Sequence, residues 1–277
     1  MTKVYNRKLK RIEEVKHFGG NKLNSIYKNK ILTRILTSKL ISKIYGLINS
    51  TKLSTRKINK FIKDNNIDMS LYENKNYKSF NDFFIRKKRN IKYDKTNFIS
   101  PVDGKLLVYK INKNSEVIVK NIKYTLKELF NENIENLDNS YMFIYRLSLD
   151  NYHRFHYIDS GKRLKRVKIK GRLHTVSSSS NKYKIYKENE REYSILETTN
   201  FGKIIYMEVG ALLVGKIINY DLDTFKRGEE KGYFLPGGST IIIIAKNIKV
   251  DSDILKNSKD GIETIVSVGE KVGEKKC

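Results

Sequence analysis

Apolar side chains recur at helical spacing in the first ninety residues. Between residues 30 and 48 they return every three or four positions, with lysine and arginine among the polar positions between them. A second helix is predicted to begin with Ser54 as its N-cap, and a third, short helix with Ser79. This pattern predicts a helical N-terminal region over residues 1–90.

From residue 91 onward the pattern changes to short alternating or continuous apolar runs separated by turn-forming residues, which is typical of strands. No repeat with a period of 20–50 residues is visible. We therefore predict an α+β fold, in which the helical region is attached to a β-rich domain over residues 91–277. The predicted strands are residues 105–111, 116–122, 141–149, 164–173, 192–198, 203–209 and 240–245.

The charge balance of the chain is extreme. Lysine and arginine number 56 against 30 acidic residues, which gives a formal net charge of +26. Such a balance favours a polyanionic partner, either nucleic acid or an anionic membrane surface. Part of the excess of positive charge also fits a bias in amino-acid usage, because lysine, asparagine and isoleucine are abundant together, as expected for an AT-rich genome. Residues 30–48 suit a membrane interface, but packing on the rest of the chain is an equally open reading.

The only cysteine, Cys277, is the last residue, which excludes an internal disulfide and a cysteine-based metal site. A reducing, cytoplasmic compartment fits this usage. Residues 1–11 lack the apolar stretch of a secretory signal, and no apolar run is long enough to span a bilayer. We expect any membrane contact to be peripheral, at the cytoplasmic face of the cell membrane.

The rarest residue types gather in three short segments that lie far apart in the sequence. The chain has two prolines and four histidines. The prolines lie in Ser100-Pro-Val-Asp-Gly104 and Pro236-Gly-Gly-Ser-Thr240, and two histidines share Tyr152-His-Arg-Phe-His156. Each segment carries a group that can act as an acid, a base or a nucleophile.

Ser239 follows two glycines and precedes a run of four isoleucines that predicts a buried strand. Glycine tolerates backbone shapes that other residues avoid. The carbonyl of Gly238 is unhindered, so the Gly238–Ser239 peptide bond is a good target for the hydroxyl of Ser239 itself. The alternative is a plain glycine turn that leads into a strand.

Asp103 and the two histidines could complete such chemistry. Asp103 lies in a turn, where it is either solvated or placed to orient a histidine. His153 and His156 could bind a metal, but zinc needs a third protein ligand and no cysteine cluster or second histidine pair supports one, so we expect no metal. Together the three segments supply a nucleophile, its base and a group that orients the base.

Longer motifs surround these segments. They are Phe83-Phe84-x-Arg86, Ser100-Pro-Val-Asp-Gly104, Asp150-Asn-Tyr-His-Arg-Phe-His156, Val209-Gly-Ala-Leu-Leu-Val-Gly215, Lys226-Arg-Gly-Glu-Glu-Lys-Gly-Tyr-Phe234, Gly237-Gly-Ser-Thr240, Gly261-Ile-Glu-Thr264 and Val268-Gly-Glu-Lys-Val-Gly273. In order and content this set resembles phosphatidylserine decarboxylases, from about residue 80 to residue 273. The lysine- and asparagine-rich style is similar to clostridial members. Val102 and Pro236 depart from the family's pattern, which often has a small residue and an aromatic there.

The resemblance implies an enzyme that makes its own cofactor. Asp103, His156 and Ser239 would form the charge-relay set for autocatalytic cleavage between Gly238 and Ser239. Ser239 would become a covalent pyruvoyl group that forms a Schiff base with phosphatidylserine, which is decarboxylated to phosphatidylethanolamine. His153 matches a second family histidine, implicated in the decarboxylation stage.

The same resemblance implies the partners. The substrate is an anionic phospholipid at a membrane surface, the fragments 1–238 and 239–277 stay associated, and family precedent suggests a homodimer. Two rival readings remain. One is a pyruvoyl decarboxylase that acts on a soluble amino acid, against which the basic N-terminal helices favour lipid. The other is a basic β-domain that binds nucleic acid, which predicts an intact chain and salt-dependent affinity.

Overall fold

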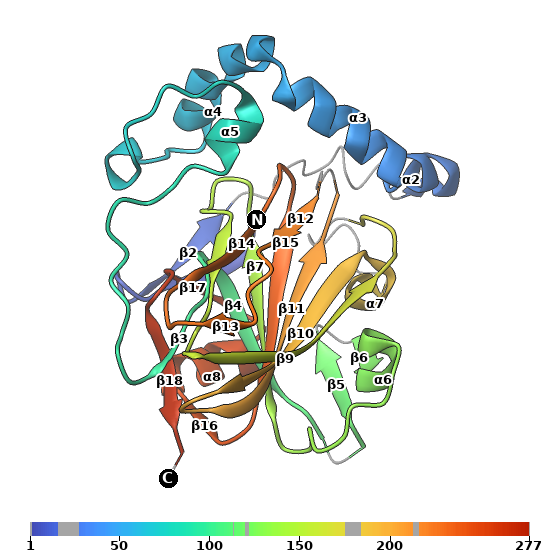
Figure 1. The fold of residues 1–277 in the computed structure, drawn as a ribbon, viewed down its shortest axis with the longest axis vertical. Coiled ribbons are helices and arrows are strands. Elements are labelled where there is room, and N and C mark those ends of the chain that lie inside the picture. Colours follow the sequence, from blue (N-terminus) through green and yellow to red (C-terminus); the bar gives the residue numbers. More distant parts are fainter. Residues whose placement is uncertain are drawn as a thin grey trace.

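The computed structural model describes residues 2–15, 28–112, 114–119, 122–174, 184–212 and 216–276 (Figure 1). Cys277 lies outside these ranges. Within them the chain combines a large twisted sheet, three small sheets and several short helices. The predicted α+β class is confirmed.

The main sheet has ten strands among the described residues, and its centre is the strand that Ser239 begins. The apolar run of that strand is continuous because both of its faces are buried. Ile241 and Ile243 pack into one core cluster, and Ile242 and Ile244 pack into another on the opposite face. In spatial order the strands are β13 (Thr224–Phe225), β9 (Gly161–Ile169), β10 (Arg191–Thr198), β11 (Gly202–Gly210), β15 (Ser239–Ala245), β7 (Tyr141–Leu147), β4 (Gly104–Lys110), β17 (Glu263–Val266), β1 (Thr2–Asn6) and β2 (Arg11–Val15).

Three smaller sheets pack around this frame. The one that matters for the site carries the histidine segment in its edge strand β8. The three sheets are β12 (Ile217–Asn219), β14 (Glu230–Phe234) and β8 (Arg154–His156); β16 (Ile248–Val250), β18 (Lys271–Lys275) and β3 (Phe98–Ile99); and β5 (Glu116–Val119) with β6 (Ile122–Thr125).

Helices α2, α3, α4 and α5 lie together across one end of the main sheet (Figure 1). The single helix expected over residues 30–48 is two helices, because Thr37 bonds back to the Thr33 carbonyl and Ser38 caps a new helix. Ser79 caps α5 as predicted, whereas Ser54 lies inside a 3₁₀ turn. The helices are α2 (Lys30–Leu36), α3 (Lys39–Ser50), η1 (Lys52–Lys57), α4 (Ile58–Asp64), η2 (Met69–Leu71), α5 (Phe80–Phe84), α6 (Leu126–Phe130), α7 (Ile185–Glu188) and α8 (Ser252–Lys259).

The N-terminal region is not helical throughout, so that part of the prediction is not confirmed. Residues 2–15 form β1 and β2, and β1 pairs in parallel with β17 in the register Val4 to Glu263. This pairing joins segments about 260 residues apart in the chain. A local pattern cannot reveal it, because Val4 is the only buried apolar side chain of these two short strands.

The α2–α3 pair has an inverted amphipathic arrangement. In α3 the buried side chains are the polar Ser42 and Asn49. The large apolar side chains of this stretch face outward instead, contrary to the usual burial of an apolar stripe. The exposed residues are Ile31, Leu32, Ile35, Leu40, Ile44, Leu47 and Ile48.

A buried ion pair connects the small sheet of β8 and β14 to the main sheet. The ammonium of Lys231 lies 2.7 Å from a carboxylate oxygen of Glu208, and both side chains are almost fully buried. The Asn219 side chain bonds to both groups. Burial lowers the pKa of Lys231 and raises that of Glu208. Burial therefore disfavours the charged form of each group, and the opposite charge of its partner stabilises that form.

Removing one partner of this pair should destabilise the protein strongly. We expect Lys231→Ala to lower the free energy of unfolding by about 3–5 kcal/mol, because it leaves a buried carboxylate unpaired. The double variant Lys231→Met/Glu208→Leu should recover most of that loss. The measurement is urea unfolding of chains that also carry Ser239→Ala, so that a single species unfolds. A loss below about 1 kcal/mol, the range of an exposed pair, would contradict the expectation.

Candidate active site

Ser239 is the first residue of β15, with Gly210 of β11 and Leu147 of β7 as its register partners. Its side chain is fully buried, and its hydroxyl has no hydrogen-bond partner among the described residues. Gly237 has a φ of +145°, a conformation that suits glycine and strains other residues. The glycine pair therefore delivers a buried, unsatisfied hydroxyl next to the Gly238 carbonyl.

His153 lies beside the segment that leads into Ser239. Its Nδ1 is 2.9 Å from the Asn151 carbonyl oxygen, which can only accept, so Nδ1 carries the proton and Nε2 has the lone pair. Nε2 has no partner among the described residues, and the ring packs 4.1 Å from that of Phe84. Burial lowers the pKa of His153 to about 3, although the Gly237 backbone acts in the opposite sense. His153 is therefore neutral at pH 7.

His156 is held by three groups around its ring. Nδ1 lies 3.0 Å from both the Gly228 carbonyl oxygen and the Tyr93 hydroxyl, and Nε2 lies 3.2 Å from the Tyr152 hydroxyl. Because the carbonyl only accepts, Nδ1 carries the proton and Nε2 is the basic nitrogen. Burial lowers the pKa of His156, whereas the Gly228 carbonyl, the negative charge of Glu230 and, to a smaller extent, that of Asp103 raise it in part.

Two glycines make room for Tyr93. Gly228 has a φ of +78°, and a Cβ there would lie 2.9 Å from the Tyr93 ring. Gly269 has a φ of +83°, and a Cβ there would clash with the Lys92 carbonyl oxygen and lie 3.1 Å from the same ring. Burial raises the pKa of the Tyr93 hydroxyl, so it stays protonated. The ring is thus fixed with its hydroxyl on His156.

Asp103 lies at the same end of the sheet but bonds to other groups. Its carboxylate accepts from the Val268 backbone N–H at 2.9 Å and pairs with the Lys88 ammonium at 2.6 Å. Among the described residues no hydrogen bond joins Asp103, His156 and Ser239 to one another. The structure brings His153 next to the scissile segment, whereas Asp103 has only a small electrostatic effect on His156, less than that of Glu230.

Sequence reasoning missed the groups that hold the histidines. Tyr152 stacks on His156, with ring centroids 5.8 Å apart. Because Tyr152 lies inside the motif that contains both histidines, its position in the sequence could have indicated this role. Gly228 also lies in a quoted motif. Tyr93 and Lys88 gave no signal, because their partners are distant in the sequence.

In the ranges that the structure describes, no group of three or more His, Cys, Asp or Glu could hold a metal ion, and no helix is long and apolar enough to cross a bilayer.

Comparison with known proteins gives the family. Residues 78–274 match the family model described as phosphatidylserine decarboxylase. The chain is 48% identical to a Clostridium acetobutylicum protein named phosphatidylserine decarboxylase proenzyme 2, over 98% of each chain. It is 46% identical to a phosphatidylserine decarboxylase proenzyme of Clostridium botulinum over all of both chains, and 42% identical to one of Clostridium tetani over 100% of this chain and 99% of that one. With matches of this extent, the chain belongs to the phosphatidylserine decarboxylase family and is an enzyme of that type.

Proposed function

We propose that this enzyme converts phosphatidylserine to phosphatidylethanolamine with a pyruvoyl group that the chain makes from its own Ser239. The observation that carries the proposal is the buried Ser239 hydroxyl, which has no partner among the described residues although it lies in the core. Leaving a buried hydroxyl unsatisfied costs free energy. A site that keeps such a group next to a glycine carbonyl fits a residue destined for reaction.

Cleavage would start when the basic Nε2 of His156 takes the proton of the Ser239 hydroxyl, after the Tyr152 hydroxyl has moved off that nitrogen. The oxygen attacks the Gly238 carbonyl carbon, and the C–N bond breaks to leave an ester and a free amine. Removal of the Ser239 α-proton then breaks the Cβ–O bond and releases the Gly238 carboxylate. Water then hydrolyses the bond between the nitrogen and the α-carbon of residue 239. The nitrogen leaves as ammonia, and the α-carbon becomes the ketone carbon. The negative charges of Glu230 and, to a smaller extent, Asp103 would support the protonated His156.

In decarboxylation the pyruvoyl carbonyl would take up the lipid amine and draw electrons from the bond that loses carbon dioxide. We assign the proton movement at this stage to Nε2 of His153, which is free of partners in the described structure. A group whose pKa is about 3 gives up an acquired proton readily. Its packing on Phe84 keeps water away from that nitrogen.

The outward apolar face of α2–α3 would dock the enzyme on the membrane that holds its substrate. Lysines among those apolar residues would face the anionic headgroups, and each adds about 1 kcal/mol near such a surface. In α3 the polar Ser42 and Asn49 are buried while the large apolar side chains are exposed to solvent. This arrangement supports the proposal, because a contiguous exposed apolar surface usually marks a site that binds a membrane or another protein.

Two measurements on purified protein test the function. Mass spectrometry under denaturing conditions should find two species, residues 1–238 and residues 239–277 carrying the ketone. Carbon dioxide release should be fast with phosphatidylserine vesicles and negligible with free serine. An uncut chain that binds nucleic acid, or equal activity on free serine, would favour one of the rival functions.

Tyr93→Phe should slow cleavage while leaving mature activity intact. The variant keeps the ring between its two glycines and removes only the hydroxyl on His156 Nδ1. Loss of one hydrogen bond of about 0.5–1.5 kcal/mol corresponds to a rate about 2- to 12-fold lower. The measurement follows fragment 239–277 over time after synthesis.

Decarboxylation per cleaved molecule serves as the control for Tyr93→Phe and should stay within about twofold of the unaltered enzyme. A general structural defect would lower both rates together. Unchanged cleavage would show that the Gly228 carbonyl alone is sufficient to orient His156.

A further inference from the structure

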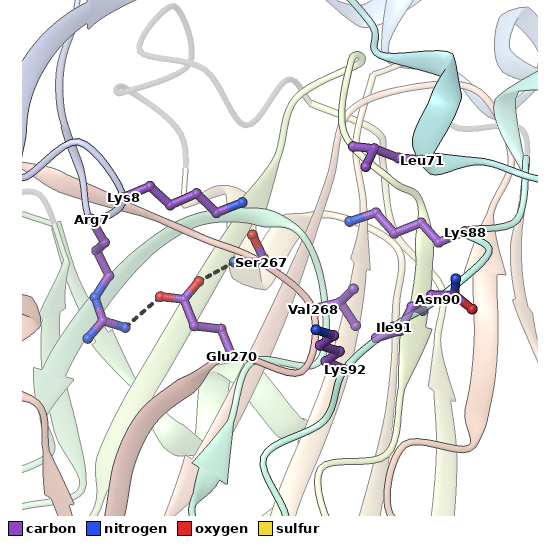
Figure 2. A pocket seen from close by; sticks show the side chains of 10 residues that line it. All are labelled: Arg7, Lys8, Leu71, Lys88, Asn90, Ile91, Lys92, Ser267, Val268 and Glu270. Atoms are coloured by element: carbon purple, nitrogen blue, oxygen red, sulfur yellow. Dashed lines mark hydrogen bonds and ion pairs between the residues drawn. The ribbon is translucent and has the colours of Figure 1, made fainter.

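A pocket of about 590 Å³ opens beside the site, where four distant segments meet (Figure 2). The turn after β1 contributes Arg7 and Lys8, and η2 contributes Leu71. The remaining lining comes from residues 88, 90, 91 and 92 and from residues 267, 268 and 270. The pocket lies at the end of the sheet that holds Asp103, since Asp103 contacts both Lys88 and Val268.

The lining is basic and is only partly neutralised. Four of its side chains are cationic and one, Glu270, is a carboxylate. Arg7 is satisfied by Asp251, Asp253 and Glu270. Among the described residues, by contrast, no carboxylate pairs with Lys8 or Lys92, so at least two positive charges are left for a ligand.

The geometry of the ammonium groups favours a bound anion. Figure 2 shows the Lys8 and Lys88 side chains pointing toward each other across the pocket, above the hydroxyl of Ser267. The Lys88 ammonium already pairs with Asp103, whereas no carboxylate of the described residues pairs with Lys8, so an anion between the two groups would supply the missing charge for Lys8. The Ser267 hydroxyl has no hydrogen-bond partner among the described residues and can donate to such an anion. Ammonium groups and a hydroxyl are common ligands of phosphate oxygens.

The far wall of the pocket, formed by Ser267 and Lys8, lies beyond the reach of the phosphate of the reacting lipid. Ser239 of β15 pairs with Leu147 of β7, and β4 separates β7 from β17, whose end leads into Ser267. Three strand spacings are about 14 Å. In a phosphatidylserine headgroup four covalent bonds separate amine and phosphorus, roughly 5 Å. A lipid whose amine is at Ser239 therefore cannot place its phosphate at Ser267, nor at Lys8, which follows the still more distant strand β1.

Exposed apolar side chains at the rim indicate the kind of phosphate. Leu71 lines the pocket and is 53% exposed, and Leu9, next to Lys8, is also 53% exposed. A basic hollow with apolar residues at its edge matches a headgroup joined to acyl chains. We propose that this pocket binds the phosphodiester of a second, non-substrate anionic phospholipid through Lys8, Lys88, Lys92 and Ser267.

The test uses the uncut Ser239→Ala chain and dihexanoyl phosphatidylglycerol below its micelle concentration. This lipid has no amine, so it cannot mimic the substrate at residue 239, and neither cleavage nor activity enters the result. Titration calorimetry should show saturable binding. Lys8→Gln/Lys92→Gln should weaken binding roughly 30-fold, since each lysine contributes to attraction of an anionic lipid.

The matched control is Lys110→Gln/Lys203→Gln. Both lysines are exposed and lie at the opposite end of the sheet, in β4 and β11, so the variant loses the same charge elsewhere. Its affinity should stay within about twofold of the unaltered value. Equal weakening in both variants, or no weakening in the pocket variant, would overturn the site. Inorganic phosphate binding as tightly as the lipid would overturn its assignment to a phospholipid.

Discussion

A Ser239→Ala chain is expected to remain a single uncut species without decarboxylase activity. Alanine has no oxygen to attack the Gly238 carbonyl, so neither the ester nor the ketone can form. The expected effect is complete loss on both readouts, a denaturing gel and carbon dioxide release from phosphatidylserine vesicles. The fold should be kept, because the serine hydroxyl makes no hydrogen bond to the described residues.

The next residue gives a matched control for this variant. The Thr240 hydroxyl is also buried and has no partner among the described residues. Adjacent strand residues point to opposite faces of the sheet, so Thr240 faces away from the side that Ser239 faces. Thr240→Val should cleave and react normally. A cut or active alanine variant at position 239 would disprove the proposed origin of the cofactor.

His156→Ala is expected to slow cleavage by about 10²- to 10⁴-fold, the usual contribution of a positioned general base. In the unaltered chain the rate should fall as pH drops through the pKa of His156, because the protonated ring cannot accept the serine proton. Burial holds that pKa below 6.5, so the half-maximal rate should lie below pH 6.5. The measurement is the rate of fragment formation in freshly synthesised protein at several pH values.

His153→Ala separates the two histidines. It should still cleave into residues 1–238 and 239–277, and the cut protein should release little carbon dioxide. The reverse outcome, an uncut His153 variant and a cut His156 variant, would assign the base to His153. The structure gives that alternative a concrete basis, since Nε2 of His153 is unpartnered whereas Nε2 of His156 is bonded to Tyr152.

The longest strands of the main sheet, β4, β7, β9, β10, β11 and β15, could be predicted because their signal is local. The isoleucine run of β15 and the apolar stretches of β10 and β11 reflect the burial of both faces of these strands, and each pattern is visible within its own segment. The same holds for α5, where the Ser79 cap stands next to the helix it begins. The segment with Ser239 was also recognisable, because two glycines before a buried strand are informative without their surroundings.

Strand β1, Lys88 and Tyr93 were missed because their roles depend on distant pairing. Strand β1 forms against β17 from the other end of the chain. Lys88 pairs with Asp103, and the Tyr93 hydroxyl bonds to a histidine 63 positions away. Neither side chain differs in its local pattern from other surface lysines and tyrosines. Three-dimensional contacts decided these roles, so no periodicity could reveal them.

The central place of β15 bears on the lifetime of the enzyme. If Ser239 becomes the ketone, that group begins a strand paired along its length with β11 and β7. A dissociable coenzyme can be replaced after chemical damage, but a group made from the main chain and locked between two neighbours cannot. Each polypeptide would then receive one reactive centre, and inactivation of that centre would require synthesis of a new molecule.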